Sequence, residues 1–101
     1  MRMILTARIP HHTFNAAMKD GTAVKKLNDI IGSCQPEATY MMSLDGLRTV
    51  VLIVDLPDPS QLPSLCEPWF LGFEADVEIQ PVATPEDFAK ADFDGIASRW
   101  T

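Results

Sequence analysis

Alternating apolar and polar residues mark out four predicted strands. Period-two alternation is typical of a strand with one buried face. The strand segments are residues 2–9, 38–44, 47–56 and 73–80. Pro10 ends the first and Pro81 the last, since proline cannot donate to a strand ladder.

Asp45-Gly46 separates the second and third strands. An Asp-Gly pair between strands predicts a hairpin with a type I′ turn, which needs positive φ at both central residues. A two-residue turn also sets the register. It places Leu44 opposite Leu47 and Tyr40 opposite Val51.

Between the first and second predicted strands, the apolar residues have the spacing of a helix. Apolar residues after Thr13 form two patches, rotated relative to each other, with Gly21 between them. This predicts a helix that breaks near Asp20-Gly21, restarts at Thr22 and ends at Gly32.

The proline-rich segment DLPDPSQLPSLCEPWF also carries a helical stripe. With Ser60 as N-cap, Pro63 falls in the first turn, where its missing N–H costs nothing. Pro68 disfavours helical geometry at the preceding residue. We therefore predict a helix over about 60–67, followed by a kink or a final distorted turn. This redirects Trp69 and Phe70, one into the core and the other to a pocket wall or interface.

A third helical region follows the last strand. Thr84-Pro85 and the acids after it are typical of a helix start. An apolar stripe continues through Phe93 to Trp100, with Asp92 as a second cap.

The resulting order is β-α-β-β-α-β plus a helical tail, which predicts an α+β, ferredoxin-like domain. Its antiparallel sheet would have the strand order 4-1-3-2. At 101 residues the chain fits one domain, with a core over 1–83 and a tail over 84–101.

One face of this sheet lacks a cover, because two helices cannot cover both faces. We assign Tyr40, Val51 and Ile53 to the helix-covered face. The open face would have an apolar centre and charged margins, and an exposed apolar patch needs a partner. We therefore predict a homodimer that pairs through this open face, with Ile4, Val50 and Leu52 in the interface.

Charge and composition narrow the classes of function. The net charge of −6 and the absence of a basic cluster argue against nucleic acid and anionic membrane surfaces as partners. The start MRMILTARIP lacks the apolar core of a signal peptide, and no apolar run is long enough to span a bilayer. Cys34 and Cys66 form no CxxC pair, so we expect reduced thiols and a cytoplasmic protein.

The element order, the hairpin MMSLDGLRTVVLIVDLPDP and the segment LCEPWFLGFEADVEIQPVATPEDF resemble the dimeric α/β-barrel superfamily over nearly the whole chain. The resemblance is greatest to a group of short bacterial members with no assigned function. The superfamily includes cofactor-independent monooxygenases, haem-degrading monooxygenases and lactone isomerases. It implies a ligand between sheet and helices, or inside the barrel formed by the pair.

The haem-degrading members share an Asn, a Trp and a haem-ligating His. This chain has Trp69, but it has no Asn on the first strand and no His on or after the second helix. The resemblance therefore does not extend to haem chemistry, and we expect no cofactor.

Few residues suggest chemistry. The candidates for catalysis are His11, Tyr40 and Arg8, and those for binding a ligand are Phe14, Tyr40, Trp69 and Phe70. His11-His12 has no metal-ligand spacing, so a structural or solvent-facing role is favoured over a catalytic one. For Tyr40, core packing is favoured over a place in a pocket between helix and sheet. We expect no metal site.

The arginines of the first strand also have two interpretations. Beside the acids of the fourth strand, Arg2 and Arg8 form either cross-strand ion pairs or a polar wall of a cavity between sheets.

Two classes of function stay open. One is a small-molecule site for an apolar or aromatic compound, with or without oxygenase-like or isomerase-like chemistry. The other is a non-catalytic dimeric module that acts through protein contacts. Whether the protein is an enzyme is not decided by the sequence.

Overall fold

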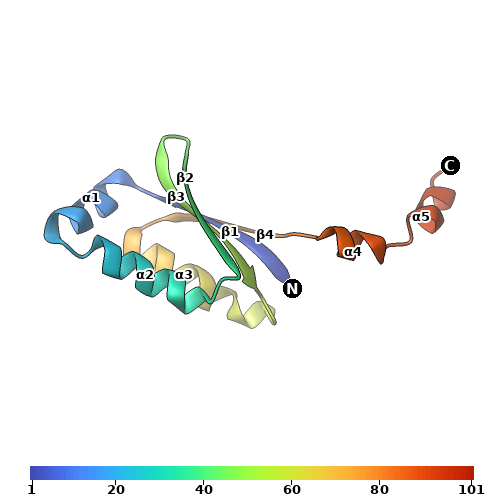
Figure 1. Ribbon diagram of the computed structural model, residues 1–101, viewed down its shortest axis with the longest axis horizontal. Coiled ribbons are helices and arrows are strands. Elements are labelled where there is room, and N and C mark those ends of the chain that lie inside the picture. Colours follow the sequence, from blue (N-terminus) through green and yellow to red (C-terminus); the bar gives the residue numbers. More distant parts are fainter.

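Four antiparallel strands form one open sheet (Figure 1). The structure is a computed structural model that describes residues 1–101. The strands are β1 (Arg2–Ile9), β2 (Ala38–Leu44), β3 (Leu47–Asp55) and β4 (Asp76–Pro81). Their spatial order is β2-β3-β1-β4, which is 4-1-3-2 counted from the β4 edge. This α+β arrangement is consistent with a ferredoxin-like fold.

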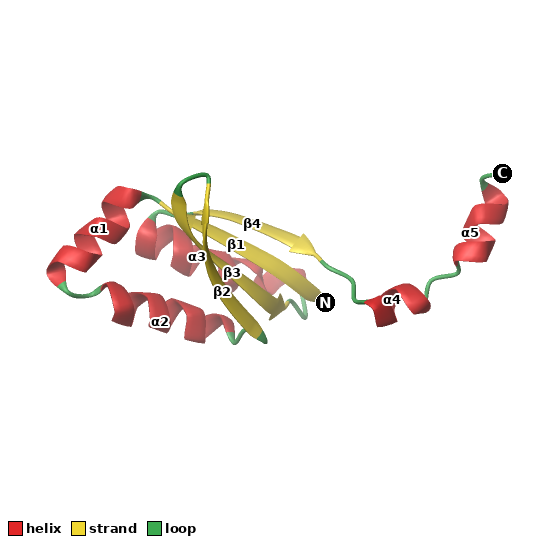
Figure 2. Cartoon of the chain, turned by 45° about the horizontal axis from the view of Figure 1, so that its top comes forward, coloured by secondary structure: helices red, strands yellow, loops and turns green.

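The helices gather on one face of the sheet, apart from the tail (Figure 2). On that face lie α1 (His11–Asp20), α2 (Ala23–Cys34) and α3 (Leu62–Phe73), with a short 3₁₀ turn over Pro59–Gln61. The tail holds α4 (Pro85–Ala89) and α5 (Phe93–Arg99). The other face of the sheet has no helix over it.

The predicted break between α1 and α2 is confirmed. Gly21 has a φ of 82° and ends α1, and its N–H bonds back to the last turn. The predicted end at Gly32 is wrong, because α2 continues to Cys34 and Gln35 adopts the left-handed cap with a φ of 48°. Helix α1 also begins earlier than expected, at His11.

The predicted end of the proline-rich helix at Glu67 is wrong as well. Helix α3 continues through Pro68 to Phe73. Asp58, rather than Ser60, caps the preceding turn, accepting a bond from Ser60 N at 2.8 Å. Pro68 lies inside the helix and costs about 3 kcal/mol, because one helical hydrogen bond is lost and the ring crowds the preceding turn. Burial of Trp69 and Phe73 contributes about 1.5–3 kcal/mol each or more, which offsets that loss.

The predicted hairpin register is confirmed. Asp45 and Gly46 have φ values of 53° and 77°, as a type I′ turn requires. Leu44 pairs with Leu47 and Tyr40 pairs with Val51. Strand β4 starts at Asp76 rather than residue 73, because helix α3 extends to Phe73.

The predicted faces of the hairpin are wrong. Val50 and Leu52, assigned to the open face and the dimer interface, are 3% and 0% exposed within one chain. They pair with Ala7 and Leu5 of β1, and cross-strand partners share a face. Val50 and Leu52 therefore pack under the helices and are not available to a partner.

The open face consequently has a different apolar centre. Ile4 lies on it as expected, paired with Ile53, and Val51 lies beside Thr6. Tyr40 extends this patch across β2. The acids of β4 lie at its other margin, where Glu78 pairs with Thr6.

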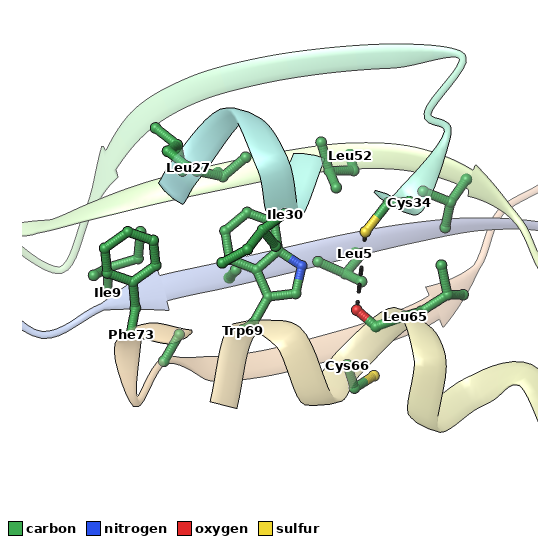
Figure 3. Close-up of a cluster of buried hydrophobic side chains, with 14 of the residues drawn as sticks. Leu5, Ile9, Leu27, Ile30, Cys34, Leu52, Leu65, Cys66, Trp69 and Phe73 are labelled. Carbon is green, nitrogen blue, oxygen red and sulfur yellow. Dashed lines mark hydrogen bonds between the residues drawn. The ribbon is translucent and has the colours of Figure 1, made fainter. Parts of the chain in front are cut away.

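The core lies between the helix-covered face and the helices α2 and α3 (Figure 3). Trp69 is fully buried at its centre, near Ile30 of α2 and Leu5 of β1. Phe73 is also fully buried and stacks on Phe14 of α1, with ring centroids 5.6 Å apart. These contacts tie the three helices to the sheet.

The tail, residues 84–101, projects away from this body (Figure 1). The molecule measures 60 × 28 × 19 Å, and its radius of gyration is 17.1 Å. A compact chain of this length has a radius near 13 Å. The helix starts are as expected: Thr84 and Asp87 form a capping box, and the Asp92 side chain accepts from Gly95 N.

Candidate ligand-binding site

A cavity of about 420 Å³ lies between the hairpin and the helices α1 and α2. Six of the ten residues lining it are hydrophobic. This size falls within the range of small-molecule pockets, about 300–1,000 Å³, and so does the mostly apolar lining. The lining residues are Ile9, Phe14, Leu27, Met41, Met42, Ser43, Gly46, Arg48, Thr49 and Val50.

The cavity exists because β2 extends beyond the helices. Met41 and Val50 are cross-strand partners on the same face of the sheet. Val50 is buried, whereas Met41 is 60% exposed. The helices therefore cover β3 and leave the underside of β2 open, so an apolar surface remains between Met41 and Leu27.

Arg48 places a cation at this cavity. Its guanidinium lies 4.5 Å from the centroid of the Phe14 ring and donates a 2.9 Å hydrogen bond to Asn15 Oδ1. Both contacts come from α1, so they hold the β3 side chain against that helix. Ser43, the cross-strand partner of Arg48, lies beside it.

Only one of the predicted ligand-binding residues lines the cavity. Phe14 does so, from α1. Tyr40 is 63% exposed on the open face of the sheet, so its assignment to the helix-covered side is wrong. Trp69 is fully buried in the core, whereas Phe70 is exposed on α3. The prediction that one ring of this pair enters the core is confirmed for Trp69. Neither ring lines the cavity, and an interface role for Phe70 stays a prediction.

The predicted catalytic candidates do not converge on the cavity. His11 is exposed at the start of α1. Arg8 lies on the open face, where it pairs with Asp45 at 3.0 Å and with Glu78 at 3.8 Å. Tyr40, on that face too, lies on β2, two strands away from β1.

The arginines of β1 form ion pairs. Arg2 bonds to Glu37 at 2.6 Å, and this contact, together with the acids Asp87 and Glu86 at the tail, raises the pKa of Arg2. Arg8 meets Glu78 of β4, which is a diagonal neighbour, because the residue directly opposite Arg8 is Asp76. Arg2 pairs with Glu37 rather than with an acid of β4. A polar cleft of about 820 Å³ lies near Arg2, at the base of the tail, where Asp55, Pro81 and Asp87 line it.

The second histidine has a partner that the sequence did not indicate. His12 Nε2 lies 3.0 Å from a carboxylate oxygen of Glu74. Both side chains are exposed, and Glu74 caps the C-terminus of α3. Thr13 donates to the Phe73 carbonyl at 2.6 Å beside this pair. These contacts fasten the start of α1 to the end of α3, which is a structural role.

The two thiols are buried and free. Burial raises the pKa of Cys34, and the nearby polar groups of Trp69 and Ser33 act in the opposite direction. Burial also raises the pKa of Cys66, with Cys34 and Glu67 adding to the effect. Cys34 Sγ lies 3.9 Å from the Leu65 carbonyl oxygen (Figure 3). Both thiols thus behave as small apolar core residues.

The site residues expected from the sequence did not include Arg48 or Met41. The hairpin register pairs Ser43 with Arg48 and Met41 with Val50, so the sequence already groups these four residues on one face. What it did not show is that this face lies toward the helices. That depends on the pairing of β3 with β1.

Comparison with known proteins adds no relative. No protein family, curated protein or solved structure matches the chain. No helix combines the length and apolar character needed to cross a membrane. No group of three or more His, Cys, Asp or Glu side chains is arranged to hold a metal ion.

Proposed function

We propose that the protein binds a small apolar or aromatic molecule in the cavity between α1, α2 and the hairpin. The observation that carries this proposal is the cavity itself, about 420 Å³ with a mostly apolar lining. Its side chains offer apolar contacts, two hydroxyls and a guanidinium. These groups suit the binding and orientation of a ligand.

A screen of aromatic and aliphatic compounds by ligand-observed NMR tests the proposal. Ser43→Trp places a large ring in the cavity and should abolish binding. Thr39→Trp is the matched control, because Thr39 shares the strand and the face but does not line the cavity. Equal binding to both variants, or no binder for the wild-type chain, would refute the proposal.

We also propose that the protein is a homodimer of the dimeric α/β-barrel kind, paired through the open sheet face. The support is the apolar surface there: Ile4, Val51 and Ile53 lie at the centre of a face that no helix covers. A solvent-exposed patch of this kind marks an interaction site. A second copy packed sheet against sheet would bury it.

The tail gives independent support for association. Phe88, Phe93, Ile96 and Trp100 are exposed, and Trp100 is 85% exposed. Val82 N bonds to the Arg2 carbonyl, so the chain leaves along β4 and away from its own body (Figure 1). These side chains lie where a neighbouring copy could cover them. They also favour the second candidate function, a dimeric interaction module without catalysis.

Sedimentation velocity distinguishes the association modes. Val51→Lys puts a charge at the centre of the open face and should convert a dimer to a folded monomer. Ile96→Ser with Trp100→Ser tests the tail in the same way, and Thr39→Lys is the control on the other face. A wild-type monomer throughout the micromolar range would show that the dimer proposal is wrong.

A further inference from the structure

The cavity beneath the hairpin has a positive lining in a protein whose net charge is −6. Arg48 is the one charged residue among those that line it. Arg2 and Arg8 both pair with carboxylates, whereas the polar contact of Arg48 is the neutral amide of Asn15. The Arg48 charge is therefore not neutralised by an ion pair.

The guanidinium is also held in place. The Asn15 amide accepts one of its hydrogen bonds, and the Phe14 ring lies 4.5 Å beneath it. A cation over an aromatic face is attracted by the ring and loses rotational freedom. Since a guanidinium has five N–H donors, one bond to Asn15 leaves others for a ligand.

A hydroxyl stands beside this cation. Ser43 is the cross-strand partner of Arg48 and also lines the cavity. Its side chain makes no hydrogen bond within the protein, in contrast to Thr49, which donates to the Leu47 carbonyl at 3.0 Å. The hairpin end of the cavity thus offers donors, while Ile9, Leu27 and Met41 supply an apolar wall.

We propose that the ligand of this cavity is an amphipathic carboxylate, aromatic or aliphatic, whose head group binds Arg48 and Ser43. The inference rests on the proposed function, which it makes more specific. A guanidinium binds a carboxylate through two parallel N–H···O bonds, and such charge-assisted bonds are stronger than neutral ones. The apolar body then lies against Leu27, Met41 and Phe14.

The charge of the ligand must be recognised locally. An overall charge of −6 repels an anion at long range, so the selectivity depends on contacts inside the cavity. Arg48 is exposed to water, which weakens the interaction. We expect a carboxylate to bind roughly tenfold more tightly than its neutral amide.

Two probes of the same shape test this charge preference: naphthalene-2-carboxylate and naphthalene-2-carboxamide. Methyl NMR of ¹³C-methionine protein reads the site directly. Met41 lies on the cavity side of β2, whereas Met1 and Met18 are exposed and line no part of the cavity. We expect the carboxylate to shift the Met41 methyl at roughly tenfold lower concentration than the carboxamide.

Variants assign the preference to one side chain. Arg48→Met keeps an unbranched stem and should bring the two probes to equal affinity. Lys25→Met makes the same change in net charge on the outer side of α2, where Lys25 pairs with Asp29, and should keep the wild-type preference. A thermal melt of each variant verifies the fold, and the comparison of probes on the wild-type protein does not depend on any variant.

The experiment distinguishes a failure of the charge inference from a failure of the proposed function. If both probes shift the Met41 methyl with equal affinity, the charge inference is wrong and the cavity is still a binding site. The charge inference is also wrong if Lys25→Met removes the preference as fully as Arg48→Met, since overall charge would then be the cause. If neither probe shifts the Met41 methyl at millimolar concentration, both the inference and the proposed function fail.

Discussion

Neighbouring residues of β3 should differ sharply in what they contribute to stability. Leu52 is 0% exposed and packs beside Leu5, whereas Ile53 lies on the open face and is partly exposed. Replacing each in turn by alanine removes similar apolar volume from opposite faces of one strand. The comparison therefore tests the face assignment, which sets both the core and the proposed dimer surface.

The expected loss of unfolding free energy follows from the burial of each side chain. Leu52→Ala removes three carbon groups at about 0.8 kcal/mol each and leaves a cavity, which brings the loss to about 3–4 kcal/mol. Ile53→Ala in a single protomer removes groups that are already partly exposed to water, and water fills the space. Its cost should be near 1 kcal/mol. The melting temperature changes by about 4–8 °C per kcal/mol in a domain of this size.

Urea denaturation followed by the fluorescence of Trp69 measures both losses. A Trp100→Phe background leaves Trp69, fully buried in the core, as the single tryptophan. The effect of Leu52→Ala should be independent of protein concentration. Any additional effect of Ile53→Ala that comes from the dimer should grow as concentration rises. Equal losses at the lowest concentration would refute the assignment of β3 to its faces.

Other consequences follow from backbone geometry and from pKa shifts. Gly46→Ala should lower the free energy of unfolding, measured in urea, by about 1–2 kcal/mol, because the φ of Gly46 is +77°. Gly32→Ala should raise it by up to about 1 kcal/mol, because Gly32 lies in α2 with open space around it. Equal changes in the free energy of unfolding for the two glycine substitutions would contradict this expectation. Hydrogen bonds with Thr84 in the capping box lower the pKa of the Asp87 carboxyl. The ionised carboxylate therefore stabilises α4 above about pH 4, and this stabilisation is lost as the pH falls through the lowered pKa. A ¹³C titration of its carboxyl that gave an ordinary pKa would contradict that. Burial raises the pKa of Cys34 and Cys66, so iodoacetamide at neutral pH should label them in urea but not in the native protein, and rapid native labelling would argue against it.

Local chemistry accounts for the features that were predicted correctly. The Asp45-Gly46 turn needs positive φ at two adjacent residues, and this requirement alone aligns β2 with β3. Gly21 ends α1 for a similar reason, and Thr84-Pro85 starts α4. Each of these signals acts within a few residues, so the sequence displays it directly.

Long-range packing decided the extent of α3. Pro68 alone predicts an end or kink, because it removes a hydrogen bond and restricts Glu67. The helix continues because Trp69 and Phe73 reach the centre of the core, and their burial outweighs the lost bond. The candidate site depends on packing in the same way. Phe14 and Arg48 are far apart in the sequence and meet only when α1 lies over the sheet.

The sequence by itself determined the elements, the hairpin and its internal register. Only the tertiary structure decided which face of that hairpin meets the helices. The segment Val50–Val54 is apolar at every position, so alternation there cannot distinguish one side from the other. Pairing with β1 makes the choice, and a shift of one residue would exchange the two faces. That choice buries Leu52, turns Tyr40 outward and brings Arg48 to the cavity.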